Sequence, residues 1–339
     1  MATSALTSTY LTLVDWAKRE KPGGGIDEIV EVLAASNPII ADANVMEGNL
    51  PTGHRSTRRS TDPTGTWRLL NYGVAAEKST TEQITDLCGI LESYSKLDVD
   101  LASLNGNEAA FRASEDNAFI TGFNDTIATA LFEGNQNNDP EKMHGLNARY
   151  NYTDYPDGAS STQVISCGGA ASTNTSIWIV TWGPQTCTLI YPKGSKAGLQ
   201  SEDLGKILVT DTNNLMYQAW VTRFQWKLGL HIRDYRYVLR LCNVDVALLT
   251  SDAATGADLM DKLVDGYYAR PTMDLGNMAK TFIYCNKTVA KFLHKQAQNK
   301  SNVNLTIDSP AGKPVVSFLD APIHICDNIS SVETTVTTA

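Results

Sequence analysis

Residues 51–73, PTGHRSTRRSTDPTGTWRLLNYG, constrain the fold of this 339-residue chain more than any other stretch. Four arginines and one aspartate give the segment a net charge of +3, although the whole chain carries −9. As a strand, residues 54–60 place Arg55 and Arg59 on one face and Arg58 on the other. A strand that is polar on both faces cannot belong to the core of its own subunit. The segment therefore either stays in solvent or rests on another molecule.

Turn residues within the segment predict a β-hairpin. Asp62-Pro63-Thr64-Gly65 fits a type I turn, with Pro at the second position and Gly at the fourth. Residues 66–71 would then return as the second strand, with Trp67 and Leu69 on one face. An isolated two-stranded hairpin is marginally stable in water, so this one needs a surface to rest on.

Two helices are predicted after the hairpin. Apolar residues three or four apart, among them Ile84, Leu87 and Leu91, predict a helix over 79–104. Phe119 and Ile127 lie on an i, i+4 stripe that predicts a second helix over 108–133, which ends at Gly134-Asn135. Residues 82–133 contain ten acidic and two basic residues, a net charge of −8. This region is the acidic counterpart of the basic hairpin.

The remaining segments mix helices and strands. An arm is expected over residues 1–50, with a short helix over 26–36. Alternating or apolar runs predict strands within 175–192, 220–232, 235–241 and 313–327, with a bulge or turn near Arg233-Asp234. Helices are predicted within 256–271 and 286–300. Long helices followed by strands indicate an α+β fold.

Composition narrows the class of protein. With 42% hydrophobic residues the chain can bury a sizeable core, and its pI of about 5.1 argues against general nucleic-acid binding. The six cysteines form no CxxC pair and no zinc-ligand spacing, so we expect free buried thiols. The N-terminus lacks the pattern of a signal peptide, and no run of eighteen apolar residues occurs. The expectation is a soluble intracellular protein.

No catalytic motif stands out. The segments PKGSKAG and AGKPV lack the spacing of a phosphate-binding loop, and neither a G-x-S-x-G nor an H-E-x-x-H motif occurs. His144 and His324 each stand near acidic residues, but a solvated loop histidine explains them better than a metal ligand does. We therefore expect no enzyme activity, catalytic residue, cofactor or metal. A hydrolase or ligand-binding protein remains an alternative of another class.

Three interpretations of the basic segment remain open on the residues alone. It could be a solvated loop, it could contact nucleic acid with Trp67 as the stacking residue, or it could dock on the acidic region of another copy.

Ordered sequence blocks resemble one known family. They include EGN (Glu47–Asn49), WRLLNYGV (Trp67–Val74), AAFRASEDNAFITGF (Ala109–Phe123), FEGNQNNDPEKMHGLNARYN (Phe132–Asn151) and WKLGLHIRDYRYVLRLCNVD (Trp226–Asp245). The set is similar to the major capsid proteins of tailed bacteriophages with the Hong Kong 97-type fold, and most similar to the epsilon-15-like group. The resemblance covers most of the chain.

That resemblance implies a division of the chain into four parts. Residues 1–45 would be the N-arm and 46–76 the E-loop, a hairpin that reaches over a neighbouring subunit. The P-domain, with its spine helix region, would comprise 77–150 and be completed by about 205–250 and 312–339. The A-domain would comprise 151–204 and 251–311.

It also implies the function and the partners. The chain would self-assemble into hexamers and pentamers of an icosahedral shell that encloses double-stranded DNA, in the virion, after assembly in the bacterial cytoplasm. Scaffold, portal and decoration proteins would be further partners, and a nanocompartment shell of the same fold is the alternative. Intersubunit contacts are expected from the E-loop residues Arg55, Arg58, Arg59, Trp67 and Arg68, and from the acidic candidates Asp98, Asp100, Glu108, Glu115 and Asp116.

Overall fold

The computed structural model describes residues 37–106, 108–151, 162–169, 173–210, 214–249, 259–271, 279–298, 305–308 and 315–336. The expected helix over 26–36 lies outside these residues. The described residues form two compact units. The first unit holds residues 90–127 and 198–227, and the second holds 37–89, 128–197 and the residues from 228 onward. Helices and strands occur in both, which confirms the α+β class.

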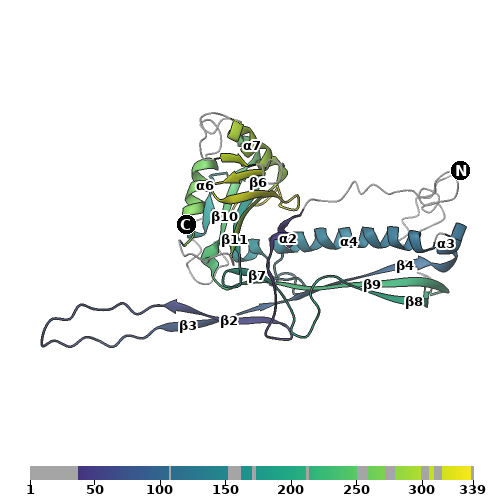
Figure 1. Cartoon of the computed structure of the whole chain (residues 1–339), viewed down its shortest axis with the longest axis horizontal. Coiled ribbons are helices and arrows are strands. Elements are labelled where there is room, and N and C mark those ends of the chain that lie inside the picture. The colour runs from purple at the N-terminus through teal and green to yellow at the C-terminus, as the bar shows by residue number, and fades with distance from the viewer. Residues whose placement is uncertain are drawn as a thin grey trace. The chain divides into compact units, whose positions relative to one another are not determined.

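A mixed sheet is the centre of the second unit (Figure 1). Its order runs β12-β13-β14-β11-β6 and continues through β10 to β5. The strands are β5 (Val164–Ser166), β6 (Asn174–Trp182), β10 (Val238–Asp245), β11 (Lys280–Cys285), β12 (Leu305–Asp308), β13 (Val315–Phe318) and β14 (Ala321–Ile325). β6 pairs antiparallel with both β10 and β11, and every one of its residues is buried. The four consecutive apolar residues Ile177–Val180 in β6 are typical of a central strand covered on both faces, and a strand was predicted here.

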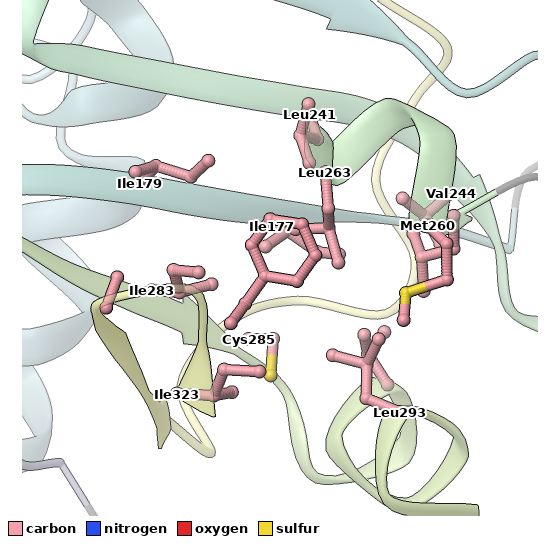
Figure 2. Close-up of a cluster of buried hydrophobic side chains, with 14 of the residues drawn as sticks. Ile177, Ile179, Leu241, Val244, Met260, Leu263, Ile283, Cys285, Leu293 and Ile323 are labelled. Atoms are coloured by element: carbon pink, nitrogen blue, oxygen red, sulfur yellow. The ribbon is translucent and has the colours of Figure 1, made fainter. Parts of the chain in front are cut away.

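Two amphipathic helices cover one face of this sheet. They are α6 (Leu259–Tyr268) and α7 (Lys287–Gln298), which confirms both predicted helices. Leu263 of α6 and Leu293 of α7 pack with Ile177 and Ile283 in one buried cluster (Figure 2). Trp178 points to the opposite face, where its ring contacts those of Phe132 and Tyr150. Apolar burial on both faces is the main source of stability for this sheet.

Short elements complete the second unit. They are α2 (Ile39–Asp42), β1 (Val45–Glu47), β2 (Gly53–Thr61), β3 (Thr80–Leu87), α5 (Leu146–Arg149), β7 (Cys187–Tyr191) and the 3₁₀ turns η3 (Tyr235–Tyr237) and η4 (Val246–Leu248). β7 lies between β1 and the last residues of β9 (Met216–Ile232). β9 ends just before Arg233, which confirms the predicted turn at that position.

The first unit combines a long helix with antiparallel strands. Its elements are α3 (Val99–Ser103), the 3₁₀ turn η1 (Leu104–Gly106), β8 (Gln200–Thr210) and parts of α4 (Glu108–Glu133), β4 (Gly89–Asp98) and β9. β9 pairs with β8 on one side and with β4 on the other. The rings of Phe119 and Phe123 on α4 contact that of Phe224 on β9. None of the helices described is long and apolar enough to span a membrane.

The predicted helix over 79–104 is wrong. Residues 80–87 and 89–98 form β3 and β4, and only 99–103 are α-helical. Burial along β4 alternates strictly, with Leu91 and Leu97 turned inward and Ile90 and Tyr94 outward. The inward face also carries two serines, and this hid the two-residue period behind an apparent helical spacing. The helix over 108–133 matches α4 at both ends.

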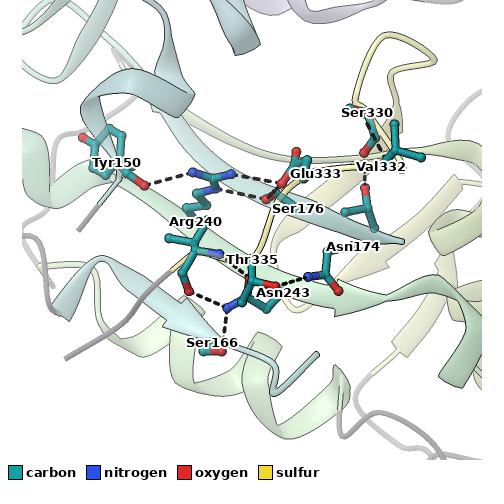
Figure 3. Close-up of polar contacts among 12 residues, drawn as sticks. Tyr150, Ser166, Asn174, Ser176, Arg240, Asn243, Ser330, Val332, Glu333 and Thr335 are labelled. Carbon is teal, nitrogen blue, oxygen red and sulfur yellow. Dashed lines mark hydrogen bonds and ion pairs between the residues drawn. The ribbon is translucent and has the colours of Figure 1, made fainter. Parts of the chain in front are cut away.

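A buried charge pair ties residues 330–336 to the central sheet (Figure 3). Arg240 on β10 is 3% exposed, and its guanidinium lies 3.0 Å from a carboxylate oxygen of Glu333. It also donates to Ser176 Oγ at 3.0 Å and to the backbone oxygen of Tyr150 at 3.1 Å. Two further hydrogen bonds join the side chain of Asn243 to the backbone of Val336.

Glu333→Gln should destabilise the protein strongly, because it leaves the Arg240 charge buried without its partner. Losing one member of a buried pair costs about 3–5 kcal/mol. We expect a matching fall in the free energy of unfolding in urea. Replacing both members, as in Arg240→Met with Glu333→Leu, should cost much less. The exposed pair Arg236–Asp234 is the control, since Arg236→Ala should cost under about 1 kcal/mol.

Candidate assembly interface

The basic segment forms a hairpin, but with a different partner strand and a different turn than predicted. β2 pairs antiparallel with β3, from Gly53 opposite Leu87 to Thr61 opposite Thr80. Asp62–Gly65 is not the turn and residues 66–71 are not a strand. The chain turns at Leu69–Tyr72, where Tyr72 N–H donates to Leu69 O at 3.2 Å and Asn71 has φ of 69°. Asparagine tolerates this left-handed conformation better than most residues. Residues 62–79 therefore form a long loop beyond the paired strands (Figure 1).

This loop exposes large apolar side chains. Trp67 is 100% exposed, Leu70 80%, Leu69 71% and Tyr72 67%. Single exposed apolar residues are ordinary on a protein surface, but several in one short loop mark a surface that binds another molecule. The expectation that Trp67 makes an intersubunit contact stays a prediction.

The hairpin arginines differ in their surroundings. Arg58 is the most buried of them, with a 3.2 Å ion pair to Glu82 on the adjacent strand and its guanidinium over the Tyr235 ring. Arg55 donates to the Thr85 hydroxyl at 3.1 Å. Arg59 is largely exposed and lies 3.5 Å from Asp62, and Arg68 is exposed in the loop. Part of the positive charge is thus paired within the chain.

A buried carboxylate anchors the root of the hairpin. Asp86 on β3 is 5% exposed and pairs with Arg149 at 2.8 Å. Its other oxygen accepts from His231 Nδ1 at 2.7 Å and from the backbone N–H of Ile232 at 3.3 Å. Gly53 lies against this site, because a Cβ there would come within 2.0 Å of the backbone oxygen of Asp86. The hairpin therefore leaves the second unit from a tightly packed, charge-paired root.

The partners of Asp86 keep its carboxyl group ionised. Burial alone would raise the pKa of its carboxyl, but the Arg149 guanidinium and the His231 hydrogen bond outweigh burial and lower the pKa to about 2. The ring of His54 lies 4.6 Å from that of His231 and completes the packing. Sequence reasoning missed this group, because Asp86 was assigned to a helix and its partners lie 63 and 145 residues away.

The five acidic candidates all belong to the first unit. Asp98 caps α3 by accepting from Asp100 N–H at 2.8 Å, so these two precede the long helix and are not part of it. Glu108 begins α4, and Glu115 and Asp116 follow on the same helix. Burial raises the pKa of Asp116, which is partly enclosed. The five residues therefore lie on the short helix α3 with its N-cap and on the first half of α4, and not on two successive long helices.

Candidate metal ligands and candidate nucleophiles among the described residues include His, Cys, Asp and Glu side chains. No group of three or more His, Cys, Asp or Glu side chains among them is arranged to hold a metal ion. The six cysteines are free thiols, and burial raises the pKa of Cys88 to about 11 and of Cys285 to about 12. The thiols of Cys88 and Cys285 therefore stay protonated at neutral pH and are poor nucleophiles.

Asp86→Asn should loosen the root of the hairpin and change the pH profile of stability. A carboxyl whose folded pKa is below its unfolded value stabilises the fold above about pH 4, and this contribution fades as pH falls toward 2. A lowering from 3.8 to about 2 corresponds to roughly 2 kcal/mol. Urea midpoints of wild type and variant should therefore differ at pH 6, and the difference should shrink as the pH falls from 4 toward 2. Asp62→Asn, in the exposed loop, is the matched control that should keep the wild-type profile.

Comparison with known proteins identifies the fold and the family. No curated protein matches the chain. Among solved structures, that of bacteriophage epsilon15 contains a chain 38% identical to this one, with a TM-score of 0.76 over 99% of this chain and 100% of that chain. The capsid of bacteriophage JBD30 matches with 9% identity and a TM-score of 0.50 over 96% and 97% of the two chains, a likeness of fold alone.

The family model described as major capsid protein GP7 matches residues 21–337. The expected Hong Kong 97-type fold and the resemblance to the epsilon-15-like group are thereby confirmed. The chain belongs to the GP7 family of major capsid proteins and is a major capsid protein of a tailed bacteriophage.

Proposed function

We propose that this capsid protein assembles into hexamers and pentamers of an icosahedral shell around double-stranded DNA, and that it has no catalytic role. The hairpin β2–β3 and its loop act as the E-loop, which docks on the acidic part of the first unit in an adjacent copy. The N-arm and the A-domain keep the divisions expected from the resemblance. The E-loop extends to the end of β3 at Leu87, so the P-domain begins after that residue instead of at 77. Scaffold, portal and decoration proteins act as partners during assembly in the host cytoplasm.

The observation that carries this proposal is the fully exposed Trp67, in a loop with four other exposed apolar side chains. Water-exposed apolar surface of this kind gains free energy when a partner covers it, by about 25 cal/mol per Å² buried. Tryptophan and arginine are the residues most often found at the energetic centres of protein interfaces. Trp67 and Arg68 stand side by side in the loop.

Charge supports a second copy as the partner. The hairpin segment carries +3, whereas residues 82–133 carry −8. Each exposed ion pair contributes only about 0–1 kcal/mol. Many such contacts in one lattice add up through multivalency, and a misplaced subunit can still dissociate. An acidic chain also suits a container of DNA, because its net charge repels the phosphate backbone.

Arg59→Glu with Arg68→Glu should abolish shell formation at physiological ionic strength, because both side chains are exposed and reverse the charge of the docking loop. Negative-stain electron microscopy and sedimentation of the expressed chain measure the yield of shells. Arg59→Lys with Arg68→Lys is the matched control and should assemble. Normal shells from the Glu variant would refute the charge-docking part of the proposal.

Arg58 requires a separate test, because it pairs with Glu82 in its own hairpin. The exchange Arg58→Glu with Glu82→Arg preserves this pair and reverses its orientation. If Arg58 acts within the chain, the single Arg58→Glu variant should lose shells and the exchange should regain them. If Arg58 instead meets an acidic residue of a neighbour, the exchange should assemble as poorly as the single variant.

The content of the shell separates a DNA container from a nanocompartment. Particles purified from phage-infected cells should hold DNA that resists nuclease until the shell is opened. Particles that enclose an enzyme and no protected DNA would contradict the proposal.

A further inference from the structure

A cavity opens in the first unit between α4 and the strands β8 and β9, with a volume of about 380 Å³. Phe224, 2% exposed, lies at its apolar side together with Leu199 and Ile120. Ile120 is 45% exposed, although it belongs to the lining. The other lining residues are polar: Arg112, Asp116, Ser201, Asp203 and Thr222. A hollow of this size and mixed lining can take up a large side chain of another molecule that has both apolar and polar surface.

The charged side of the cavity is acidic. Asp116 and Asp203 face one guanidinium, that of Arg112, which already pairs with Asp203 at 2.8 Å. Arg112 is held further by its position over the Trp220 ring, 4.4 Å from the centroid. The lining thus has one carboxylate more than it has cations. An apolar side chain next to a cation is the group that fits both sides of the cavity.

Residues 67 and 68 of the E-loop are such a pair, a large apolar side chain followed by a cation. Trp67 is completely exposed, and Arg68 follows it in the same loop. An indole ring is large and rigid, and it gains most when it enters a preformed apolar hollow. The neighbouring guanidinium can then reach a carboxylate at the rim.

From these observations we propose that this cavity receives the E-loop tip of a second copy, with the Trp67 indole against Ile120, Leu199 and Phe224 and the Arg68 guanidinium at Asp116. The inference rests on the proposed function, since it names the receiving surface of that same contact. In this arrangement Trp67 is the buried centre of the interface, and the hairpin arginines lie at its edge.

Photo-cross-linking tests the contact in assembled particles. Trp67 is replaced by p-benzoylphenylalanine, equal amounts of ¹⁴N- and ¹⁵N-labelled chains are co-assembled, and irradiated shells are digested for mass spectrometry. Cross-links should join residue 67 to peptides that contain Ile120 or Leu199, with mixed-isotope pairs among them. Cross-links to another surface, or pairs of one isotope only, would overturn the inference, including the case in which the chain's own loop fills the cavity.

A second pair of variants keeps the test decisive if the cross-linker variant does not assemble. Ile120→Arg fills the cavity with a charge and should lower the yield of shells at least tenfold. Ala118→Arg places the same charge at an exposed position on the same helix and should stay within twofold of wild type. Wild-type yield from Ile120→Arg would exclude the cavity as the docking site while leaving shell formation intact. A wild-type chain that never forms shells would refute the proposed function itself.

Discussion

The exposed hairpin β2–β3 depends on the ion pair and hydrogen bonds that the Asp86 carboxylate makes at its root. β2 and β3 form a two-stranded sheet of their own, which is not extended by a third strand among the described residues. Beyond its root the hairpin contacts the rest of its unit through Arg58, which lies over the Tyr235 ring. A lone hairpin is marginal in water. The ion pair with Arg149 and the hydrogen bond from His231 secure one end, and from there the loop with Trp67 extends into solvent. A firm root and a free tip suit an element whose partner is another molecule.

Much of the fold followed from residue patterns that act locally. The apolar residues Ile177–Val180 of β6, the stripe of α4 and the amphipathic helices α6 and α7 each bury a surface whose pattern is visible in the sequence. β4 was not predicted as a strand because its inward face mixes leucines with Ser93 and Ser95. Small polar residues on a buried face remove the apolar alternation that identifies a strand.

The basic hairpin could be predicted in kind but not in detail. A segment polar on both faces indicated a hairpin outside the core, and its exposure agrees with that. The Asp62–Gly65 turn failed because the pairing of β2 with β3 has a longer range than any turn signal, and it moves the reversal to Leu69–Tyr72. Arg58 and Glu82 form an ion pair because β2 pairs with β3. The prediction of a helix over residues 79–104 excluded this strand pairing and therefore also the ion pair. The cavity beside α4 is equally invisible to sequence, since its lining comes from three separate elements.

The Arg240–Glu333 pair has a consequence for the order of folding. The two residues are 93 positions apart, and a guanidinium buried in the central sheet without its carboxylate is costly. We therefore expect the pairing of β6 with β10 to reach its full stability only once residues 330–336 have docked. A segment far from both strands in the sequence is then needed for the central sheet to complete its folding.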